Sequence, residues 1–128
     1  MIGYVERMVL ATCNKAKRLI FVNYVGQVRP SDLERSQDDL KKLLAELSPN
    51  FRLLINLTGL ESMHPDCVGA VGELMKLIDQ ASVGMVVRVI PDPKKDIGLN
   101  ILTIFHYRKH PRVVTCQTMM EAAKVLSL

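Results

Sequence analysis

The residues best suited to chemistry lie in one short segment, residues 56–69, which reads Asn-Leu-Thr-Gly-Leu-Glu-Ser-Met-His-Pro-Asp-Cys-Val-Gly. A cysteine thiolate is a nucleophile, and its pKa falls near a helix start or beside a histidine. Cys67, with His64 close by, therefore suggests a thiol nucleophile. Two features argue against it: Cys67 belongs to the apolar stripe of the helix that follows, and residues 71–73 lack the anion-binding arginine of phosphatase and rhodanese loops. We therefore expect Cys67 in the core and no catalytic residue in the chain.

Common metal and nucleotide sites are not predicted. The three histidines are too dispersed to bring two imidazoles and a carboxylate onto one metal ion. The three cysteines are odd in number and far apart, which is typical of reduced thiols rather than of structural zinc or a disulfide framework. Neither Gly-x-Gly-x-x-Gly nor Gly-x-x-x-x-Gly-Lys-Ser/Thr occurs, so the two common nucleotide cradles are absent.

A basic cluster near the C-terminal end consists of Arg108, Lys109, His110 and Arg112. The formal net charge is +4, but aromatic residues make up only 5% of the chain and Trp is absent, so few side chains can stack on bases. A solvated turn is the more frequent meaning of such a cluster. We therefore do not predict nucleic-acid binding.

Length and composition limit the architecture that positions these residues. The 128 residues suffice for one domain with a proper core, so we take residues 1–128 as a single domain. Apolar residues make up 48%, and no apolar run approaches the ~20 residues of a membrane span, which argues against disordered, fibrous and membrane-spanning classes. The N-terminus lacks the basic start and long apolar stretch of a signal peptide, so we expect a cytoplasmic protein.

Apolar periodicity predicts the secondary structure. Short runs rich in β-branched and aromatic residues predict strands, and apolar residues at i, i+3, i+4 and i+7 predict helices. The predicted strands are 4–12, 19–25, 51–57, 83–90 and 112–116. The predicted helices cover about 31–47, 67–81, 92–110 and 118–126, with capping-box spacing at Ser31 and Thr118.

This order of elements predicts an α/β domain: a mainly parallel five-stranded sheet with an N-terminal hairpin and about four helices. In open sheets of this kind, ligands and partners bind at the carboxyl ends of the strands, beside the starts of the following helices. Residues 58–64 form the longest stretch without an assigned element. We expect a loop there and place the functional site on it.

The order of elements, joined to particular residues, resembles the STAS domain, the fold of anti-sigma-factor antagonists. The family loop has the type Asp-Leu-Ser, several residues, Asp-Ser-Ser-Gly-Leu. The matching features, in chain order, are a strand that ends in Gly26, the loop residues Asn56-Leu57-Thr58 and 64–68, the turn into a strand at 81–87, and Glu121-Ala122 in the closing helix. The resemblance covers the chain from about Leu19 onward and implies a non-catalytic binding module of the kind used in bacterial signalling.

The resemblance also implies a difference from the best-known members, in which a Ser at the start of the second helix is phosphorylated by a partner kinase. Asp66 matches that phosphoacceptor, and His64, Pro65 and Cys67 replace its family neighbours. The phosphoacceptor Ser is thus lacking. Two alternatives stay open: the permanent charge of Asp66 mimics a phosphorylated state, or the site has been lost.

We therefore hypothesise a STAS-like regulatory domain that docks a partner protein, such as an anti-sigma factor or a kinase-like regulator, through the loop and the start of the second helix. The residues assigned to this surface are Thr58, Ser62, His64, Asp66, Cys67, Val68, Gly69 and Gly72. The alternative is a carrier of a small molecule or lipid, or else a thiol enzyme, that uses the same strand-end pocket. The carrier is implied by a second branch of this general fold, thought to hold apolar ligands between sheet and helix. No cofactor is predicted, and the oligomeric state stays open.

Overall fold

Five strands form one mixed sheet whose spatial order is the order of the chain, β1-β2-β3-β4-β5. The computed structural model describes residues 7–92, 103 and 106–128. Over these residues the strands are β1 (Arg7–Asn14), β2 (Leu19–Val28), β3 (Arg52–Met63), β4 (Met85–Val89) and β5 (Arg112–Cys116), and the helices are α1 (Pro30–Ala45), α2 (Cys67–Gln80) and α4 (Met119–Leu126). β1 and β2 pair antiparallel, whereas the other neighbouring strands pair parallel. The predicted α/β class and N-terminal hairpin are confirmed.

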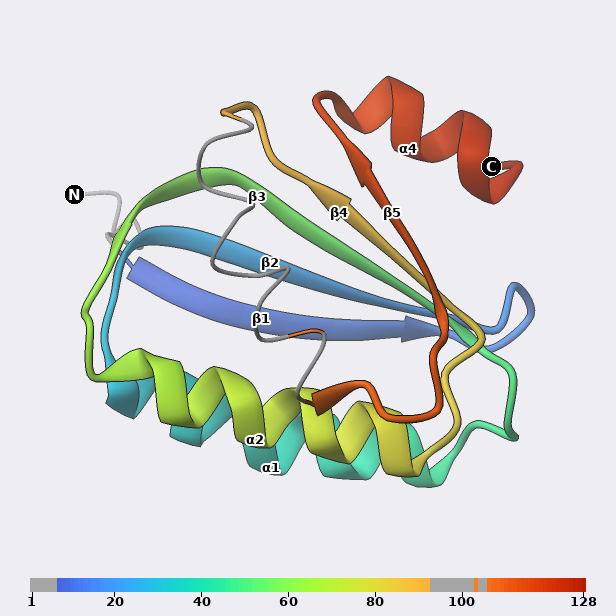
Figure 1. The fold of residues 1–128 in the computed structure, drawn as a ribbon, viewed down its shortest axis with the longest axis horizontal. Coiled ribbons are helices and arrows are strands. Elements are labelled where there is room, and N and C mark those ends of the chain that lie inside the picture. Colours follow the sequence, from blue (N-terminus) through green and yellow to red (C-terminus); the bar gives the residue numbers. More distant parts are fainter. Residues whose placement is uncertain (1–6, 93–102, 104–105) are drawn as a thin grey trace, which may run out of the picture.

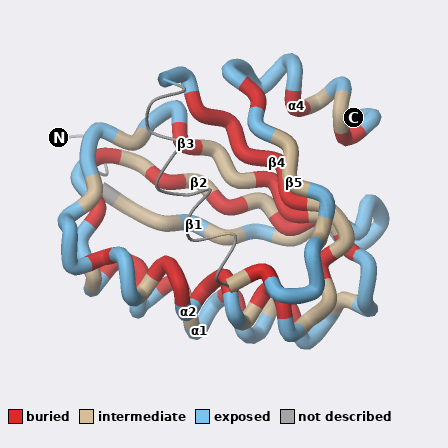
Figure 2. Tube along the Cα trace, viewed as in Figure 1, coloured by how far each residue is buried: buried red, intermediate tan, exposed pale blue. Residues whose placement is uncertain are grey.

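Helices cover both faces of the sheet. α1 and α2 lie side by side against one face, and α4 lies against the other face at the β4–β5 edge (Figure 1). The larger core fills the space between the sheet and α1 and α2, and a smaller core, which includes Leu54, Val87 and Leu126, lies under α4. Figure 2 shows the result, with buried residues on the sides of α1 and α2 that face the sheet and along most of β4. β4 is therefore a central strand covered on both faces, as its nearly continuous apolar sequence predicts.

β3 is much longer than predicted, and this is the main correction to the expected fold. Residues 58–63, expected in a loop, continue the strand to Met63 because β2 also continues and pairs with them as far as Val28. Two register irregularities in this region, at Asn23/Val25 and Gly26/Gln27, interrupt the apolar alternation that would mark a strand in the sequence. β4, in contrast, ends opposite Asn56. In the described part of the chain, the last part of β3 therefore has a strand on one side only.

The helix starts were predicted with mixed success. α1 begins at Pro30, one residue before the expected cap Ser31, and Asp32 rather than Glu34 accepts a hydrogen bond from the N-cap backbone, Arg29 N, at 2.9 Å. Proline suits the first helical position because its φ is already helical and it lacks an N–H to satisfy. α4 begins after Thr118 as predicted, with Thr118 Oγ1 accepting from Glu121 N at 3.1 Å.

Two further helix predictions have different outcomes. Helical spacing over 118–126 predicts Met119, Ala122, Ala123 and Leu126 on the inner stripe of α4, but Met119 is 38% exposed and the buried residues of the helix are Ala122 and Leu126. Most of the helix predicted from about 92 to 110 lies outside the described residues. Among the helices that are described, none is long and apolar enough to cross a membrane.

Candidate functional site

The predicted docking residues divide into an exposed group and a buried group. Thr58 and Ser62 are exposed on the last part of β3, and His64 and Asp66 are exposed in the turn before α2. His64 Nδ1 accepts a hydrogen bond from Asp66 N at 3.1 Å and lies 3.5 Å from the Asp66 carboxylate. This turn is therefore ordered by its own polar contacts while its side chains remain in solvent.

At the start of α2, Val68 and Gly69 are exposed, whereas Cys67 and Gly72 face the interior. Cys67 is fully buried in the core, as predicted, with Sγ 3.6 Å from Val28 O. Burial raises the pKa of the Cys67 thiol, so the thiolate needed for nucleophilic attack is disfavoured. The thiol therefore acts as a small core side chain.

Gly72 allows close packing against α2, which is the more frequent role of such a helical glycine. A Cβ placed on Gly72 would lie 2.7 Å from His106 Nε2, closer than real Cβ contacts allow. The imidazole of His106 therefore rests on the helix backbone at Gly72, where no side chain intervenes. This contact joins α2 to the segment that leads into β5.

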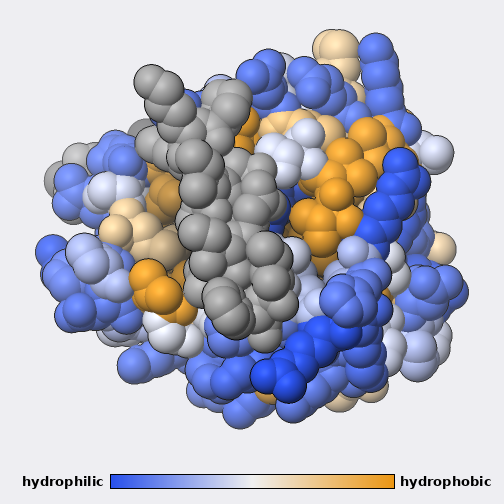
Figure 3. Space-filling view, in the orientation of Figure 1, coloured by the Kyte–Doolittle hydropathy of each residue, from blue (hydrophilic) through white to orange (hydrophobic). Residues whose placement is uncertain are grey.

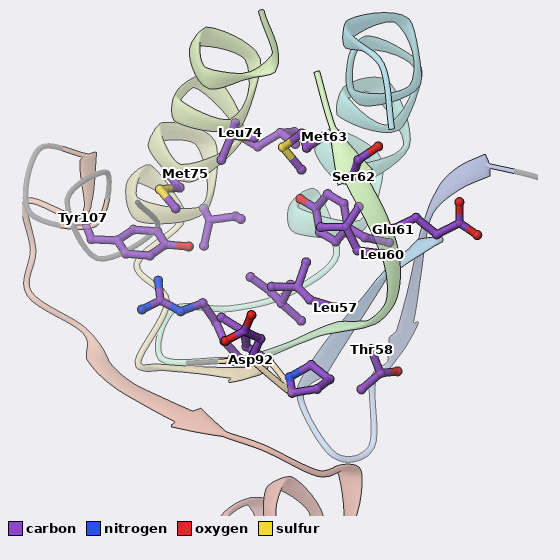
Figure 4. Close-up of a pocket in the computed structure, with 17 residues that line it drawn as sticks. Leu57, Thr58, Leu60, Glu61, Ser62, Met63, Leu74, Met75, Asp92 and Tyr107 are labelled. Carbon is purple, nitrogen blue, oxygen red and sulfur yellow. The ribbon is translucent and has the colours of Figure 1, made fainter. Parts of the chain in front are cut away.

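A cavity of about 620 Å³ lies where β3 continues beyond β4, between the sheet and α2. Figure 4 shows Leu57 on the strand wall and Leu74 on the opposite helix wall, with Met75 beside Tyr107. The described residues lining it are mainly apolar and come from β2, β3, α2, β4 and the segments after β4 and before β5: Tyr24, Ile55, Leu57, Thr58, Leu60, Glu61, Ser62, Met63, Val71, Leu74, Met75, Ile78, Arg88, Ile90, Pro91, Asp92 and Tyr107. In the view of Figure 3, apolar surface also lies on both sides of the strip of residues that is not described.

Three polar side chains that line this cavity are buried, those of Tyr24, Arg88 and Tyr107. Arg88 on β4 is only 1% exposed, and its Nη1 donates to Thr103 Oγ1 at 2.9 Å. Tyr107 is 2% exposed, and its buried hydroxyl has no hydrogen-bond partner among the residues that the structure describes. Figure 4 shows this hydroxyl directed into the cavity. An apolar cleft with a few convergent polar groups is the usual form of a small-molecule site.

Both tyrosines at the cavity are neutral hydrogen-bond donors at physiological pH. Burial raises the pKa of Tyr24 to about 12, and Cys67 adds to the effect. Burial also raises the pKa of Tyr107, and the nearby Arg88 charge offsets only part of this rise. Each phenol therefore keeps its proton. The hydroxyl of Tyr107 can thus donate a hydrogen bond to an acceptor inside the cavity.

The sequence and fold were compared with those of known proteins. No protein-family model matches the sequence, and a search of the curated proteins also finds no match. An uncharacterized DUF3478-family protein with a SpoIIAA-like fold, from Shewanella loihica PV-4, matches with a TM-score of 0.74 at 14% identity, over 98% of this chain and 99% of that one. The anti-sigma factor antagonist SpoIIAA in its unphosphorylated form matches with a TM-score of 0.63 at 13% identity, over 93% and 97% of the two chains. An anti-sigma factor antagonist from Mycobacterium paratuberculosis matches with a TM-score of 0.60 at 15% identity, over 95% of each chain.

The chain has the SpoIIAA-like fold. The resemblance to the STAS domain is thereby confirmed at the level of architecture, over nearly the whole chain. Within this fold, the end of β3 and the start of α2 carry the exposed predicted residues, and two of these, Thr58 and Ser62, also line the cavity.

Sequence reasoning missed the three buried polar residues of the cavity, Tyr24, Arg88 and Tyr107, although one signal was present. Arg88 interrupts the apolar run of β4, a strand predicted to be covered on both faces. A charge at such a position is rarely buried without a polar environment, so it marks polar groups nearby. Tyr24 and Tyr107 stand at distant positions in the chain and give no such local signal.

Two other predicted features can also be placed. In the basic cluster, Lys109 is held in the fold: its N–H donates to Asp79 Oδ1 at 3.0 Å and its Nζ donates to Ser82 Oγ at 2.8 Å. It therefore ties the turn before β5 to the end of α2. No three His, Cys, Asp or Glu side chains in the described part of the chain are grouped as they would be to hold a metal ion.

Gly72→Ala should lower the free energy of unfolding by about 1–3 kcal/mol, because the new methyl group overlaps the His106 ring. Gly69→Ala is the matched control on the same helix, since a Cβ there meets nothing within 4 Å. It should be neutral or stabilising by up to ~1 kcal/mol. Urea unfolding measures the free energy of unfolding of both variants. Adding His106→Ala to Gly72→Ala should recover part of the stability that Gly72→Ala loses. Equal effects of the two glycine substitutions would contradict the proposed contact.

Stability should fall as pH rises from about 10 to about 12. In the unfolded chain Tyr24 ionises near its usual pKa of ~10, whereas the folded protein holds it neutral up to about 12. The unfolded state therefore releases the proton first, and the stability contributed below pH 10 is lost across this window, by at most about 3 kcal/mol. Urea unfolding at pH 8 and pH 11 should show a smaller decrease for Tyr24→Phe than for the natural protein. Parallel decreases would contradict the prediction.

Proposed function

We propose that this domain binds a small, largely apolar ligand in the cavity between β3, β4 and α2. The observation that carries the proposal is the cavity of about 620 Å³ with the buried, unpartnered hydroxyl of Tyr107 directed into it. A buried polar atom without a partner costs on the order of 1–3 kcal/mol, which a bound acceptor would recover. The volume is within the ~300–1,000 Å³ typical of small-molecule pockets.

The location of the cavity supports the same function. Ligands in open α/β sheets bind beyond the carboxyl ends of the strands, and this cavity lies beyond the end of β4. No catalytic role is proposed: the Cys67 thiol is buried and its pKa is raised, and the matching structures are described as anti-sigma factor antagonists or as uncharacterized. The ligand is therefore carried or sensed rather than converted.

A second candidate function is docking of a regulatory protein by the exposed start of α2. The specific observation in its favour is Val68, a large apolar side chain that is 56% exposed next to the exposed carboxylate of Asp66. Two proteins with this fold are anti-sigma factor antagonists, which act on another protein. In this function Asp66 stands at the phosphoacceptor position as a permanent negative charge. Thr58, Ser62, His64 and Gly69 extend the surface, which Cys67 and Gly72 support from below.

Leu57→Trp should weaken ligand binding about tenfold, because the indole narrows the space between the strand wall and the helix wall. The neutral fluorescent probe N-phenyl-1-naphthylamine, whose emission rises in apolar surroundings, reports the binding. The matched control is Val68→Trp, which adds the same side chain on the exposed surface of α2 and should bind the probe like the natural protein. Far-UV circular dichroism verifies the fold of both variants. Absence of probe binding to the natural protein would refute the proposed cavity function.

Asp66→Arg should abolish capture of a partner protein from a lysate of the native cell while leaving the domain folded. The control is Asp39→Arg, which makes the same charge reversal at an exposed position of α1. A protein retained by the natural domain and by Asp39→Arg, but not by Asp66→Arg, identifies a partner of the α2 start. If all three proteins retain the same set, docking through Asp66 is wrong.

A further inference from the structure

We propose that the cavity selects neutral apolar ligands that carry one carbonyl oxygen, and that this oxygen accepts a hydrogen bond from the Tyr107 hydroxyl. A medium-length ketone, ester or amide has this chemistry. The inference rests on the proposed ligand-binding function and names its ligand class. Two properties of the described lining carry it: a buried donor that needs an acceptor, and charges that are already engaged within the protein.

Tyr107 determines that the ligand must accept a hydrogen bond. Its hydroxyl is buried, has no hydrogen-bond partner among the described residues and points into the cavity (Figure 4). Burial raises the pKa of this phenol, so the hydroxyl keeps its proton and remains a donor. The acceptor must therefore come from whatever occupies the cavity. A ligand oxygen at this position removes the penalty of an unsatisfied buried donor, which a hydrocarbon cannot do.

A carbonyl oxygen suits this donor better than a hydroxyl oxygen. Both can accept a hydrogen bond, but a hydroxyl group brings a proton that needs an acceptor of its own. The walls beside Tyr107 are formed by apolar side chains, among them Leu57, Leu74 and Met75, which offer no strong acceptor. The rest of the ligand lies against these walls and is therefore expected to be apolar.

The charged side chains of the described lining disfavour an anionic ligand. They are Arg88, Glu61 and Asp92, one positive and two negative. Arg88 donates to Thr103 Oγ1, and both Arg88 and Asp92 make further interactions within the protein, so the guanidinium is not left for a ligand. Burying a carboxylate without a cation to pair with it costs far more than burying a neutral carbonyl. A neutral acceptor is therefore the one that gains most from Tyr107.

The two carboxylates of the lining do not replace the ligand as the acceptor for Tyr107. Glu61 and Asp92 are both exposed, and Figure 4 shows Glu61 pointing away from the cavity. Their negative charges also oppose the entry of an anion from the exposed side. Position and charge at the exposed side thus favour the same neutral ligand as the buried hydroxyl does.

The test compares octan-2-one with octanoate, which has the same chain length but a charged acceptor, by isothermal titration calorimetry at pH 8 on the 128-residue chain. At ~30 Å³ for a group the size of a water molecule, the heavy atoms of either compound need about half of the cavity or less. We expect octan-2-one to bind the natural protein about tenfold more tightly than octanoate, because only octanoate must carry its charge into the cavity.

Tyr107→Phe should weaken octan-2-one binding about fivefold, the usual net effect of losing one hydrogen bond between neutral groups. N-phenyl-1-naphthylamine has no oxygen acceptor, so its affinity should be the same for Tyr107→Phe and the natural protein. Thr58→Val removes a hydroxyl at an exposed position of the lining and is the matched control, which should leave octan-2-one affinity unchanged. A purely structural role of Tyr107 would instead weaken the binding of octan-2-one and of the probe alike.

The outcomes separate this inference from the function on which it rests. If octanoate binds as tightly as octan-2-one, or if Tyr107→Phe leaves octan-2-one affinity unchanged or weakens probe binding equally, the inference is wrong while probe binding to the natural protein upholds the cavity function. If octan-2-one does not bind but the probe does, the conclusion is the same. If Tyr107→Phe does not fold, the comparison of octan-2-one with octanoate on the natural protein decides. If both compounds and the probe fail to bind, the inference and the cavity function are both wrong.

Discussion

The unequal length of two neighbouring strands determines most of what is distinctive in this domain. β3 pairs with β4 as far as Asn56 and then continues to Met63, where β2 is its one neighbour among the described strands. Sheet pairing would otherwise place the next backbone at ~4.8 Å from β3, so the early end of β4 leaves an open space beside the strand. α2 crosses over this space because it connects the end of β3 to the start of β4. The cavity is thus a consequence of strand length, and apolar side chains of β3 and α2 become its walls.

Arg88 shows how this arrangement accommodates a buried charge. Moving a guanidinium out of water costs several kcal/mol unless polar groups surround it. Its position one residue before the end of β4 places the side chain beside the cavity, where Thr103 accepts one of its hydrogen bonds. The same side chain in the middle of the sheet would face apolar residues on every side. The end of a strand therefore permits a charge that the body of the strand would exclude.

The sequence correctly predicted features that depend on local periodicity. It did not predict features that depend on strand pairing or on contacts between residues far apart in the chain. The apolar stripe of α2 placed Cys67 in the core correctly, because helical spacing alone determines which side chains face the sheet. Residues 58–63 were expected in a loop, because their strand conformation comes from pairing with an irregular partner, β2. The polar end of the cavity joins Tyr24, Arg88 and Tyr107 from three distant segments. No spacing rule relates these residues, so only the folded chain reveals the site.

The two candidate functions share the end of β3 and the start of α2. On β3, Thr58 and Ser62 line the cavity together with Leu60 and Met63 and are also exposed to solvent. On α2, the cavity side is formed by Val71, Leu74, Met75 and Ile78, and Val68 projects outward. Packed elements transmit displacements because the interior has little free volume outside the cavity. A ligand that shifts α2 relative to β3 would therefore change the affinity of the outer surface for a partner. By thermodynamic linkage, the partner would change the ligand affinity by the same factor.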